Sequence, residues 1–294
     1  MLLVGQSFEV WREPLASALA TGDAGSLVAQ ARGQLAAGAH AIDVNVGASG
    51  DASTLVSAAA ALRASMPGVT LWLDSGDASA IVAALEAVPG PLVANAAALR
   101  GGAEAVVAAA ARAGAGVVVT PRLADQAGTA SIEELLILVA EGERLAAEAG
   151  IAGPLYLDAL AFPPAHERGL ALRSIALLRT LASRRVERGG GSMSLVAVGN
   201  VGHGAPPRVR SSLRRVYAAL VVGAGVDALI APVEDRALMR LLRVLDGTEA
   251  ASTPGLAWLE RLSEATRLGE RLPAPPDDAG PGLQHAWVLL AGRA

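Results

Sequence analysis

Aspartate and asparagine side chains recur in this sequence among and directly after short apolar runs. In the first such run, Ile42, Val44 and Val46 alternate with Asp43 and Asn45. Apolar runs of this length are typical of buried strands, and alternate side chains of a strand share a face. Burying a carboxylate beside an amide is unfavourable unless each finds a partner. The pair therefore indicates either a ligand site at the end of a strand or a locally hydrogen-bonded turn.

The same arrangement follows other apolar runs of the chain. Carboxylate, amide or hydroxyl side chains stand directly after these runs at Asp74, Ser75, Asn95, Asp158 and Asn200. Turn residues normally lie in loops, so positions at the ends of apolar runs favour a binding site. Carboxylates accept hydrogen bonds from ring N–H and amino groups, and amides both donate and accept. We therefore expect the set to bind a flat, nitrogen-rich heterocycle rather than phosphate, because no lysine or arginine joins it.

A metal site is a weaker interpretation of the same residues. Asp43, Asp74 and Asp158 offer the carboxylate oxygens that magnesium prefers, but nothing in the sequence fixes them on one side of a site. The glycine-rich segment that begins at Gly199 is too loosely patterned to indicate phosphate binding. We therefore expect no metal here.

The composition excludes several kinds of chemistry. The chain has 294 residues and a net charge of −4, so no overall positive field would attract nucleic acid. It contains no cysteine, which excludes thiolate catalysis, disulfides and cysteine-ligated metals. All 24 basic residues are arginine, which excludes Schiff-base chemistry on a lysine. No signal peptide and no apolar run of about 18 residues is visible, which favours a cytoplasmic protein that does not enter membranes.

Apolar runs alternate with amphipathic helical segments along the chain. Eight runs are expected to be strands, at residues 2–4, 39–46, 69–73, 91–94, 116–120, 155–157, 195–198 and 228–231. Helical segments between them carry start signals, such as Asp77 and a capping box that pairs Ser131 with Glu134. Strands that are apolar throughout favour a parallel sheet. Eight such units in about 250 residues predict an α/β (β/α)₈ TIM barrel, with an open doubly wound sheet as the competing fold.

Two regions of the chain are predicted to differ in organisation. Residues 1–246 should form the barrel, and residues 247–294 should form a C-terminal helical extension. In the extension we expect a helix at 254–272 and an apolar end at 287–290 that covers the bottom of the barrel or a dimer face. The stretch Thr21-Gly22-Asp23 is expected to begin a helix, with Ala24, Leu27, Ala31 and Leu35 along one face, that ends at Gly38.

The strand-end motifs resemble those of the pterin-binding TIM barrels. The resemblance is carried by Asp-Val-Asn-Val-Gly at 43–47, Leu-Asp-Ser at 73–75, Asn95, Leu-Asp at 157–158, Gly-Asn-Val at 199–201 and the segment 224–231. It runs in order from residue 1 to about residue 245. It is strongest to the methyltetrahydrofolate:corrinoid methyltransferases and to the folate domain of cobalamin-dependent methionine synthase.

This resemblance implies a role for each strand-end residue. The residue matching Asn200 lies against N5 of the pterin, where its amide stabilises charge as the methyl group leaves, so Asn200 is the expected catalytic residue. The pterin-binding residues implied are Asp43, Asn45, Asp74, Ser75, Asn95, Asp158 and Asn200 itself. The implied reaction moves the N5 methyl of methyltetrahydrofolate to the cobalt of a corrinoid protein.

The resemblance also implies partners. The sequence shows no cobalamin-binding module, so the cobalamin would be carried by a corrinoid protein supplied in trans, and a homodimer is expected. Two alternatives stay open: a folate- or pterin-binding protein without methyltransferase activity, and a folate-dependent transferase that passes a one-carbon unit to a small molecule.

The chain departs from these proteins at the rim of the expected site. They read Gly-Glu-Arg-x-Asn after the first strand, where this chain has Gly-Gln-Ser-Phe-Glu at 5–9; Ala96 replaces a serine, and glycines at 199 and 202 replace the serines that flank Asn-Val. Possible rim residues are Glu9, His203 and Arg208, each with a solvated side chain as the alternative. Dihydropteroate synthase shares the barrel, but its Ser-Arg-Pro loop and late lysine and arginine motifs are missing.

Overall fold

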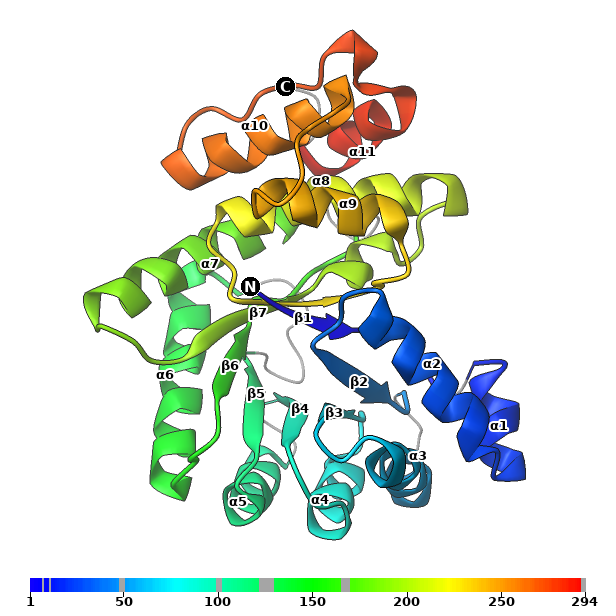
Figure 1. The fold of residues 1–294 in the computed structure, drawn as a ribbon. Helices are drawn as coiled ribbons and strands as arrows, with labels where there is room; N and C mark the ends of the chain where they lie inside the picture. The colour runs from blue at the N-terminus through cyan, green and yellow to red at the C-terminus, as the bar shows by residue number, and fades with distance from the viewer. Residues whose placement is uncertain are drawn as a thin grey trace.

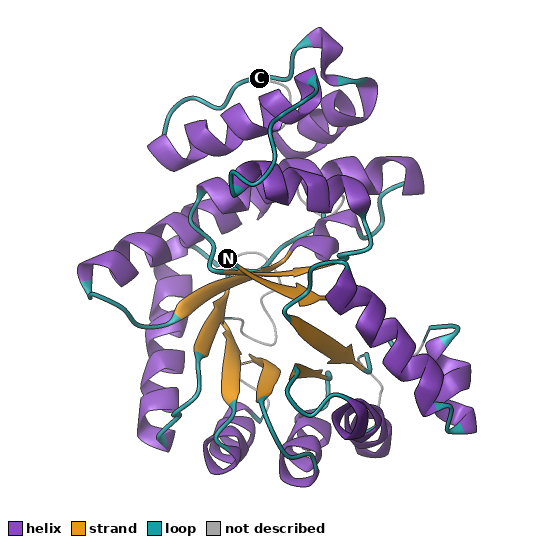
Figure 2. Ribbon diagram, viewed as in Figure 1, coloured by secondary structure: helices purple, strands orange, loops and turns teal. Residues whose placement is uncertain are grey.

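The polypeptide folds into a closed barrel of parallel strands surrounded by helices (Figures 1 and 2). The structure is a computed structural model that describes residues 1–6, 8–10, 12–47, 51–98, 102–121, 130–164 and 170–291. Within these residues each strand pairs with the next one in sequence, and β8 pairs with β1 to close the barrel. The predicted (β/α)₈ TIM barrel is confirmed, and the open doubly wound sheet is excluded.

Strands and helices alternate in the order that the apolar runs predict. The strands are β1 (Leu2–Gly5), β2 (Ala41–Asn45), β3 (Thr70–Asp74), β4 (Leu92–Ala98), β5 (Gly116–Thr120), β6 (Leu155–Asp158), β7 (Met193–Ala197) and β8 (Ala228–Ala231). The helices are α1 (Leu15–Thr21), α2 (Ala24–Ala36), α3 (Ala52–Ser65), α4 (Ala78–Ala87), α5 (Ala103–Ala113), α6 (Ile132–Ala149), α7 (Leu170–Glu187), α8 (Pro207–Gly223), α9 (Arg236–Leu245), α10 (Pro254–Leu268) and α11 (Pro281–Ala291), with 3₁₀ turns η1 (Val198–Gly202) and η2 (Asp277–Ala279). In the described part of the chain, no helix is both long and apolar enough to cross a membrane.

Three groups of buried apolar side chains hold the barrel and its helices together. Two of them lie between the strands and the surrounding helices. The third fills the barrel interior and consists of Val4, Ala41, Trp72, Val93, Val118, Tyr156, Leu195, Ala228 and Ile230. Because side chains alternate along a strand, the residues two positions beyond these also point inward. This alternation turns four strand-end residues into the barrel: Asp43, Asp74, Asn95 and Asp158.

Side chains at the helix starts explain where several helices begin. Asp77 accepts the backbone N–H of Ser79 at the start of α4, as the sequence predicts. Ser131 and Glu134 form the predicted capping box of α6. Each such cap satisfies backbone donors that have no partner inside the helix, so these polar residues fix the ends of the strand–helix connections.

The structure differs from the prediction before α2 and at the end of β4. The helix expected to begin at Thr21-Gly22-Asp23 is α2, whose N-cap is Asp23, but the short helix α1 before it was not predicted. β4 continues to Ala98 beyond its predicted end at residue 94, with a shift of register against β5 between Ala94 and Ala97. Asn95 therefore lies within a strand, at an irregularity of the kind that redirects side chains.

The C-terminal helices α10 and α11 pack against the outer side of α8 (Figure 1). The rings of Trp258 and Trp287 meet edge to face, with centroids 5.8 Å apart. α8 and α10 approach so closely at Gly223 that a Cβ there would lie 2.1 Å from the Ser263 carbonyl oxygen. The helix predicted at 254–272 ends at Leu268, and the apolar end of the chain covers α8 rather than the bottom of the barrel.

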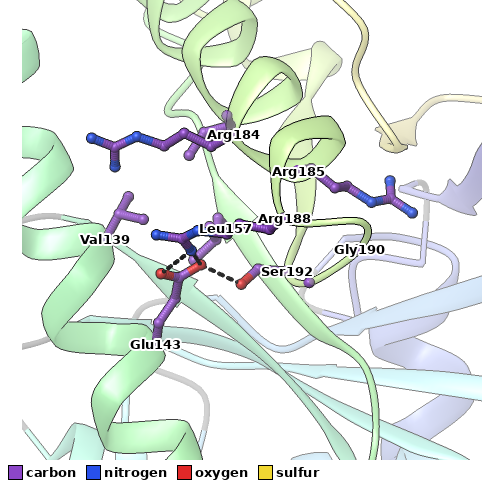
Figure 3. A pocket seen from close by; sticks show the side chains of 10 residues that line it. Val139, Glu143, Leu157, Arg184, Arg185, Arg188, Gly190 and Ser192 are labelled. Atoms are coloured by element: carbon purple, nitrogen blue, oxygen red, sulfur yellow. Dashed lines mark hydrogen bonds and ion pairs between the residues drawn. The ribbon is translucent and has the colours of Figure 1, made fainter.

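Arginines at the end of α7 form a cluster on the outside of the barrel (Figure 3). Arg188 pairs with Glu143 of α6 at 3.2 Å, and Ser192 donates to the same carboxylate at 2.6 Å. Arg185 pairs with Asp227, just before β8. The cavity between these side chains measures about 20 Å³, which is room for about one water molecule. The cluster therefore ties α6 and α7 to the sheet and is not a ligand site.

Candidate functional site

A layer of polar side chains lies above the apolar interior of the barrel, at the C-terminal ends of the strands. Asn45 pairs in register with Asp74, and Asp74 pairs with Asn95, across β2, β3 and β4. Asp43 points to the same side one step deeper, because it precedes Asn45 by two positions. This end of a (β/α)₈ barrel is where such folds place their active sites. The structure therefore brings these four predicted residues together.

Two amide–carboxylate pairs organise this layer. Asn95 Nδ2 donates to Asp43 Oδ1 at 2.8 Å, and Asn45 Nδ2 donates to Asp74 Oδ2 at 2.6 Å. Asp43 and Asn95 form the deeper pair, with 1% and 5% of their surface exposed. The oxygen of Asn45 also accepts the backbone N–H of Gly47 at 2.8 Å. Asn45 therefore shapes a turn and belongs to the polar layer at the same time.

Burial changes the proton affinity of these carboxyl groups. It raises the pKa of Asp43 well above the ordinary value, the charge of Asp74 raises it further, and the Asn95 hydrogen bond opposes both effects. Burial and then the charge of Asp158 raise the pKa of Asp74 to about 7. Near neutral pH the layer can therefore both accept and release a proton. Among the described residues, no three His, Cys, Asp or Glu side chains are placed to hold a metal ion.

Asp158 is held by a turn that follows β6. Burial raises the pKa of Asp158 to about 6, and the backbone N–H of Leu160, 2.9 Å from Oδ1, opposes this shift. Leu160 has a φ of 59°, a conformation that residues other than glycine rarely adopt. The hydroxyl of Ser174, on α7, donates to the Leu160 carbonyl at 2.6 Å. Ser174 therefore supports the turn that orients Asp158.

Two further predicted residues follow the ends of β3 and β7. Ser75 is buried and its oxygen accepts the backbone N–H of Asp77 at 3.1 Å, so it takes part in the turn before α4. Asn200 is half-buried on η1, immediately after β7. Its carbonyl accepts the N–H of His203, and no described residue hydrogen-bonds its side-chain amide. Asn200 is therefore positioned at the barrel end with its amide uncommitted to the described protein groups.

The rim candidates separate into two groups. Glu9 and His203 line an open pocket of about 420 Å³ whose wall also includes Gln6, Arg12, Gly199, Gly202, Gly204, Arg210, Arg214 and Pro232. Arg208 is exposed and does not line it. Burial lowers the pKa of His203; the charge of Glu9 opposes this effect, and the charges of the three arginines add to it. These charged side chains therefore converge around His203.

The unusual glycine before Asn200 has a structural partner. A Cβ on Gly199 would lie 1.9 Å from the side-chain oxygen of Gln6. Only glycine leaves room for Gln6 in this position, and the Gln6 oxygen is buried with no hydrogen bond among the described residues. The two departures from the expected motifs, at residues 6 and 199, are therefore in direct contact at the rim.

The sequence patterns did not predict several residues of the site. Thr120 ends β5, is buried, and points inward because it follows Val118 by two positions. Arg210 and Arg214 line the pocket, whereas Arg208, the residue selected from the sequence, does not. The spacing of four residues between Arg210 and Arg214 places them on one face of a helix, which was the signal that could have found them.

The sequence matches the family model described as pterin binding enzyme over residues 15–231. This chain belongs to the pterin-binding enzyme family. The matched region of this pterin-binding enzyme runs from α1 to the end of β8 and contains every residue of the polar layer. No curated protein sequence gives a significant match.

Solved structures that share the fold of this pterin-binding enzyme include several dihydropteroate synthases. The enzyme from Thermus thermophilus in complex with 6HMPPP aligns with a TM-score of 0.60 and 22% identity over 84% of this chain and 94% of that one. The enzyme from Vibrio fischeri gives a TM-score of 0.61 and 13% identity over 84% and 92%. The enzyme from Yersinia pestis gives 0.58 and 18% over 84% and 93%. At these identities the likeness establishes the fold and not the reaction.

Proposed function

We propose that this pterin-binding enzyme transfers the N5 methyl group of methyltetrahydrofolate to the cobalt of a corrinoid protein. The observation that supports this most is the layer of paired carboxylates and amides at the ends of β2, β3 and β4, together with Asn200, which follows β7 at the same end of the barrel and whose amide no described residue bonds. The carboxylates of the layer can accept hydrogen bonds from the pterin ring, and the Asn200 amide can donate a hydrogen bond to N5.

The pterin ring would bind through its amino and N–H donors. Two parallel N–H groups on one edge of the ring match the two oxygens of a carboxylate, as the fork of an arginine does. Asp74 and Asp158 are half-buried and would accept these donors. Their raised pKa values mean that ring binding competes with a proton, so the ligand favours the ionised carboxylates.

The methyl step needs assistance at the nitrogen that loses the methyl group. A cobalt(I) nucleophile supplied by the partner would attack the methyl carbon, the electrons of the C–N bond would stay on N5, and N5 would end with a proton in place of the methyl. A tertiary amine is a poor leaving group unless N5 is protonated or hydrogen-bonded in the transition state. An Asn200 amide directed at N5 would stabilise that state more than the ground state, which is the condition for catalysis.

Condensation of a pterin diphosphate with para-aminobenzoate is the second candidate. It is favoured by the fold shared with dihydropteroate synthases, one of them in complex with 6HMPPP, and by the arginine-lined pocket. The chain contains no lysine, so it lacks the late lysine motif expected of a dihydropteroate synthase. Incubation with both substrates and detection of dihydropteroate decides whether this reaction occurs.

Calorimetry with methyltetrahydrofolate tests the ring-binding part of the proposal. We expect Asp74→Ala, Asn95→Ala and Asp158→Ala each to weaken binding by about 5- to 150-fold, because a buried donor left unpaired costs about 1–3 kcal/mol. If the wild-type protein binds no folate at millimolar concentration, the proposal is rejected. Single-turnover transfer to cob(I)alamin then tests the reaction itself.

A further inference from the structure

The pocket at the rim concentrates positive charge in a chain that is acidic overall. Arg12, Arg210 and Arg214 line it, against the single carboxylate of Glu9, whereas the net charge of the chain is −4. Its volume of about 420 Å³ is comparable to the smaller ligand sites of proteins, which begin near roughly 300 Å³. The pocket therefore has the charge and the size to receive an anionic group.

Arg210 and Arg214 keep donors that no described residue of the protein bonds. Arg12 pairs with Glu9 at 3.0 Å. Arg210 donates its Nε to the Ala205 carbonyl at 2.8 Å, and no described residue bonds its terminal nitrogens. Arg214 approaches the Asp235 carboxylate only to 3.7 Å, and its Nε is buried without a partner among the described residues. A buried donor without an acceptor, such as the Arg214 Nε, is unfavourable, and the terminal nitrogens of the exposed Arg210 are open to a ligand, so a molecule that brings acceptor oxygens would be stabilised here.

The pocket adjoins the polar layer through the segment that follows β1. The backbone of Glu9 forms a bridge with that of Asn45, and Val10 donates to the Asn45 carbonyl at 3.0 Å. The wall residues Gly199 and Gly202 also flank Asn200, the expected catalytic residue, in the chain. A molecule whose ring lies on the layer can therefore extend a substituent into the pocket.

We propose that this pocket binds the carboxylates of the glutamate tail of a folate whose ring occupies the polar layer. This inference rests on the proposed function, because it assigns a second part of the same substrate. The layer itself contains Asp74 and Asp158, which repel a negatively charged tail when they are ionised. The arginine fork matches a carboxylate with two parallel hydrogen bonds, so the tail is drawn away from the acidic layer and towards Arg210 and Arg214.

Binding of three ligands to the full chain tests this assignment. The ligands are a tetrahydropterin without a tail, methyltetrahydrofolate with one glutamate, and methyltetrahydrofolate with three glutamates. We expect the affinity to rise along this series at low salt, and the rise to shrink when salt screens the charges. The variants are Arg210→Gln and Arg214→Gln, and the matched control is Arg261→Gln, an exposed arginine of α10.

The expected result is a selective loss. Each pocket variant should lower the affinity for the tailed ligands by about tenfold, the typical effect of a hydrogen bond to a charged group, and leave the tail-free pterin unchanged. The control should bind all three ligands as the wild type does. Because Arg214 is partly buried, Arg210→Gln provides a second variant, and melting temperatures show whether either change unfolds the protein.

Three results would overturn the assignment. The first is equal affinity of wild type for tailed and tail-free ligands, which leaves the ring site and the proposed function intact. The second is an equal loss for tailed and tail-free ligands in folded variants, which makes the arginines part of the ring site. The third is a higher affinity for a pterin diphosphate than for the tail-free pterin, with no higher affinity for the ligands that carry glutamates. This result assigns the pocket to a diphosphate. If neither the tail-free pterin nor the tailed ligands bind, the proposed function is rejected instead.

Discussion

The amide of Asn95 on β4 donates to the carboxylate of Asp43 on β2 across 2.8 Å, past the intervening strand β3. The bond crosses the inside of the barrel and joins two side chains that solvent scarcely reaches. It gives a buried carboxyl group the partner that burial demands, and it fixes the floor on which a ring would lie.

Removal of this bond should destabilise the protein. Asn95→Ala leaves the Asp43 carboxyl without its donor, which should lower the free energy of unfolding by about 1–3 kcal/mol. The loss in the double variant with Asp43→Ala should be smaller than the sum of the two single losses, because the residues share one interaction. Urea unfolding of the four proteins measures this, and additive losses would contradict a direct pair.

Stability should fall as the pH rises towards neutrality. The folded-state pKa of Asp74 is raised from 3.8 to about 7, so between these values the folded state holds a proton that the unfolded state has lost. The unfolded state is favoured progressively across that window, and the slope ends above the folded pKa. Asp74→Asn carries no titrating group and should flatten this part of the profile. Melting temperatures of both proteins across the window test it; parallel profiles would show that Asp74 does not contribute.

Ser174 should act on the pterin site through Asp158. Ser174→Ala removes the donor to the Leu160 carbonyl and relaxes the turn whose N–H bonds Asp158. The Asp158 pKa should then rise above its present value of about 6, and the pH at which folate binding reaches half its maximum should rise with it. Thr180→Ala, which removes another hydroxyl of α7 that bonds a helix carbonyl, is the control. A loss of stability without a shift of the pH profile would limit Ser174 to a structural role.

Gln6 and Gly199 should behave as one unit. Gly199→Ala places a Cβ against the end of the Gln6 side chain, which can swing aside, so the cost in stability should stay within about 1 kcal/mol. The displaced Gln6 should nevertheless weaken binding at the rim, and Gln6→Ala added to Gly199→Ala should restore it. A double-mutant cycle on folate affinity should give a coupling of about 0.5–3 kcal/mol; a coupling of zero would separate the two residues.

Local patterns in the sequence predicted the barrel and most of its elements. β5 and β8 have the predicted bounds, because each is a continuous apolar run between clear breaks. The predicted β4 ended too early because Asn95 and the alanines after it are residue types depleted in strands. In the structure, pairing with the neighbouring strands of the barrel overrides that preference. α1 was missed because seven residues show too little of a helical period.

The positions of several site residues could be predicted from the sequence, but their hydrogen-bond partners could not. The strand-end positions of Asp43, Asn45, Asp74, Asn95 and Asp158 follow from strand alternation once the fold is a closed barrel. Which amide bonds which carboxylate depends on the barrel's curvature and on the irregularity of β4, and neither is visible in the sequence. Arg210 and Arg214 reach the rim through the packing of α8, which depends on contacts far apart in the chain.

Single-turnover methyl transfer tests the central proposal most directly. Wild type and Asn200→Ala would be mixed with methyltetrahydrofolate and cob(I)alamin, free and on a corrinoid protein, with the folate dissociation constant measured beside the rate. We expect transfer by the wild type and a loss of about 10²–10³-fold in rate for Asn200→Ala, with a much smaller loss of folate affinity. Folate binding without transfer to either acceptor, or equal losses of rate and affinity, would contradict it.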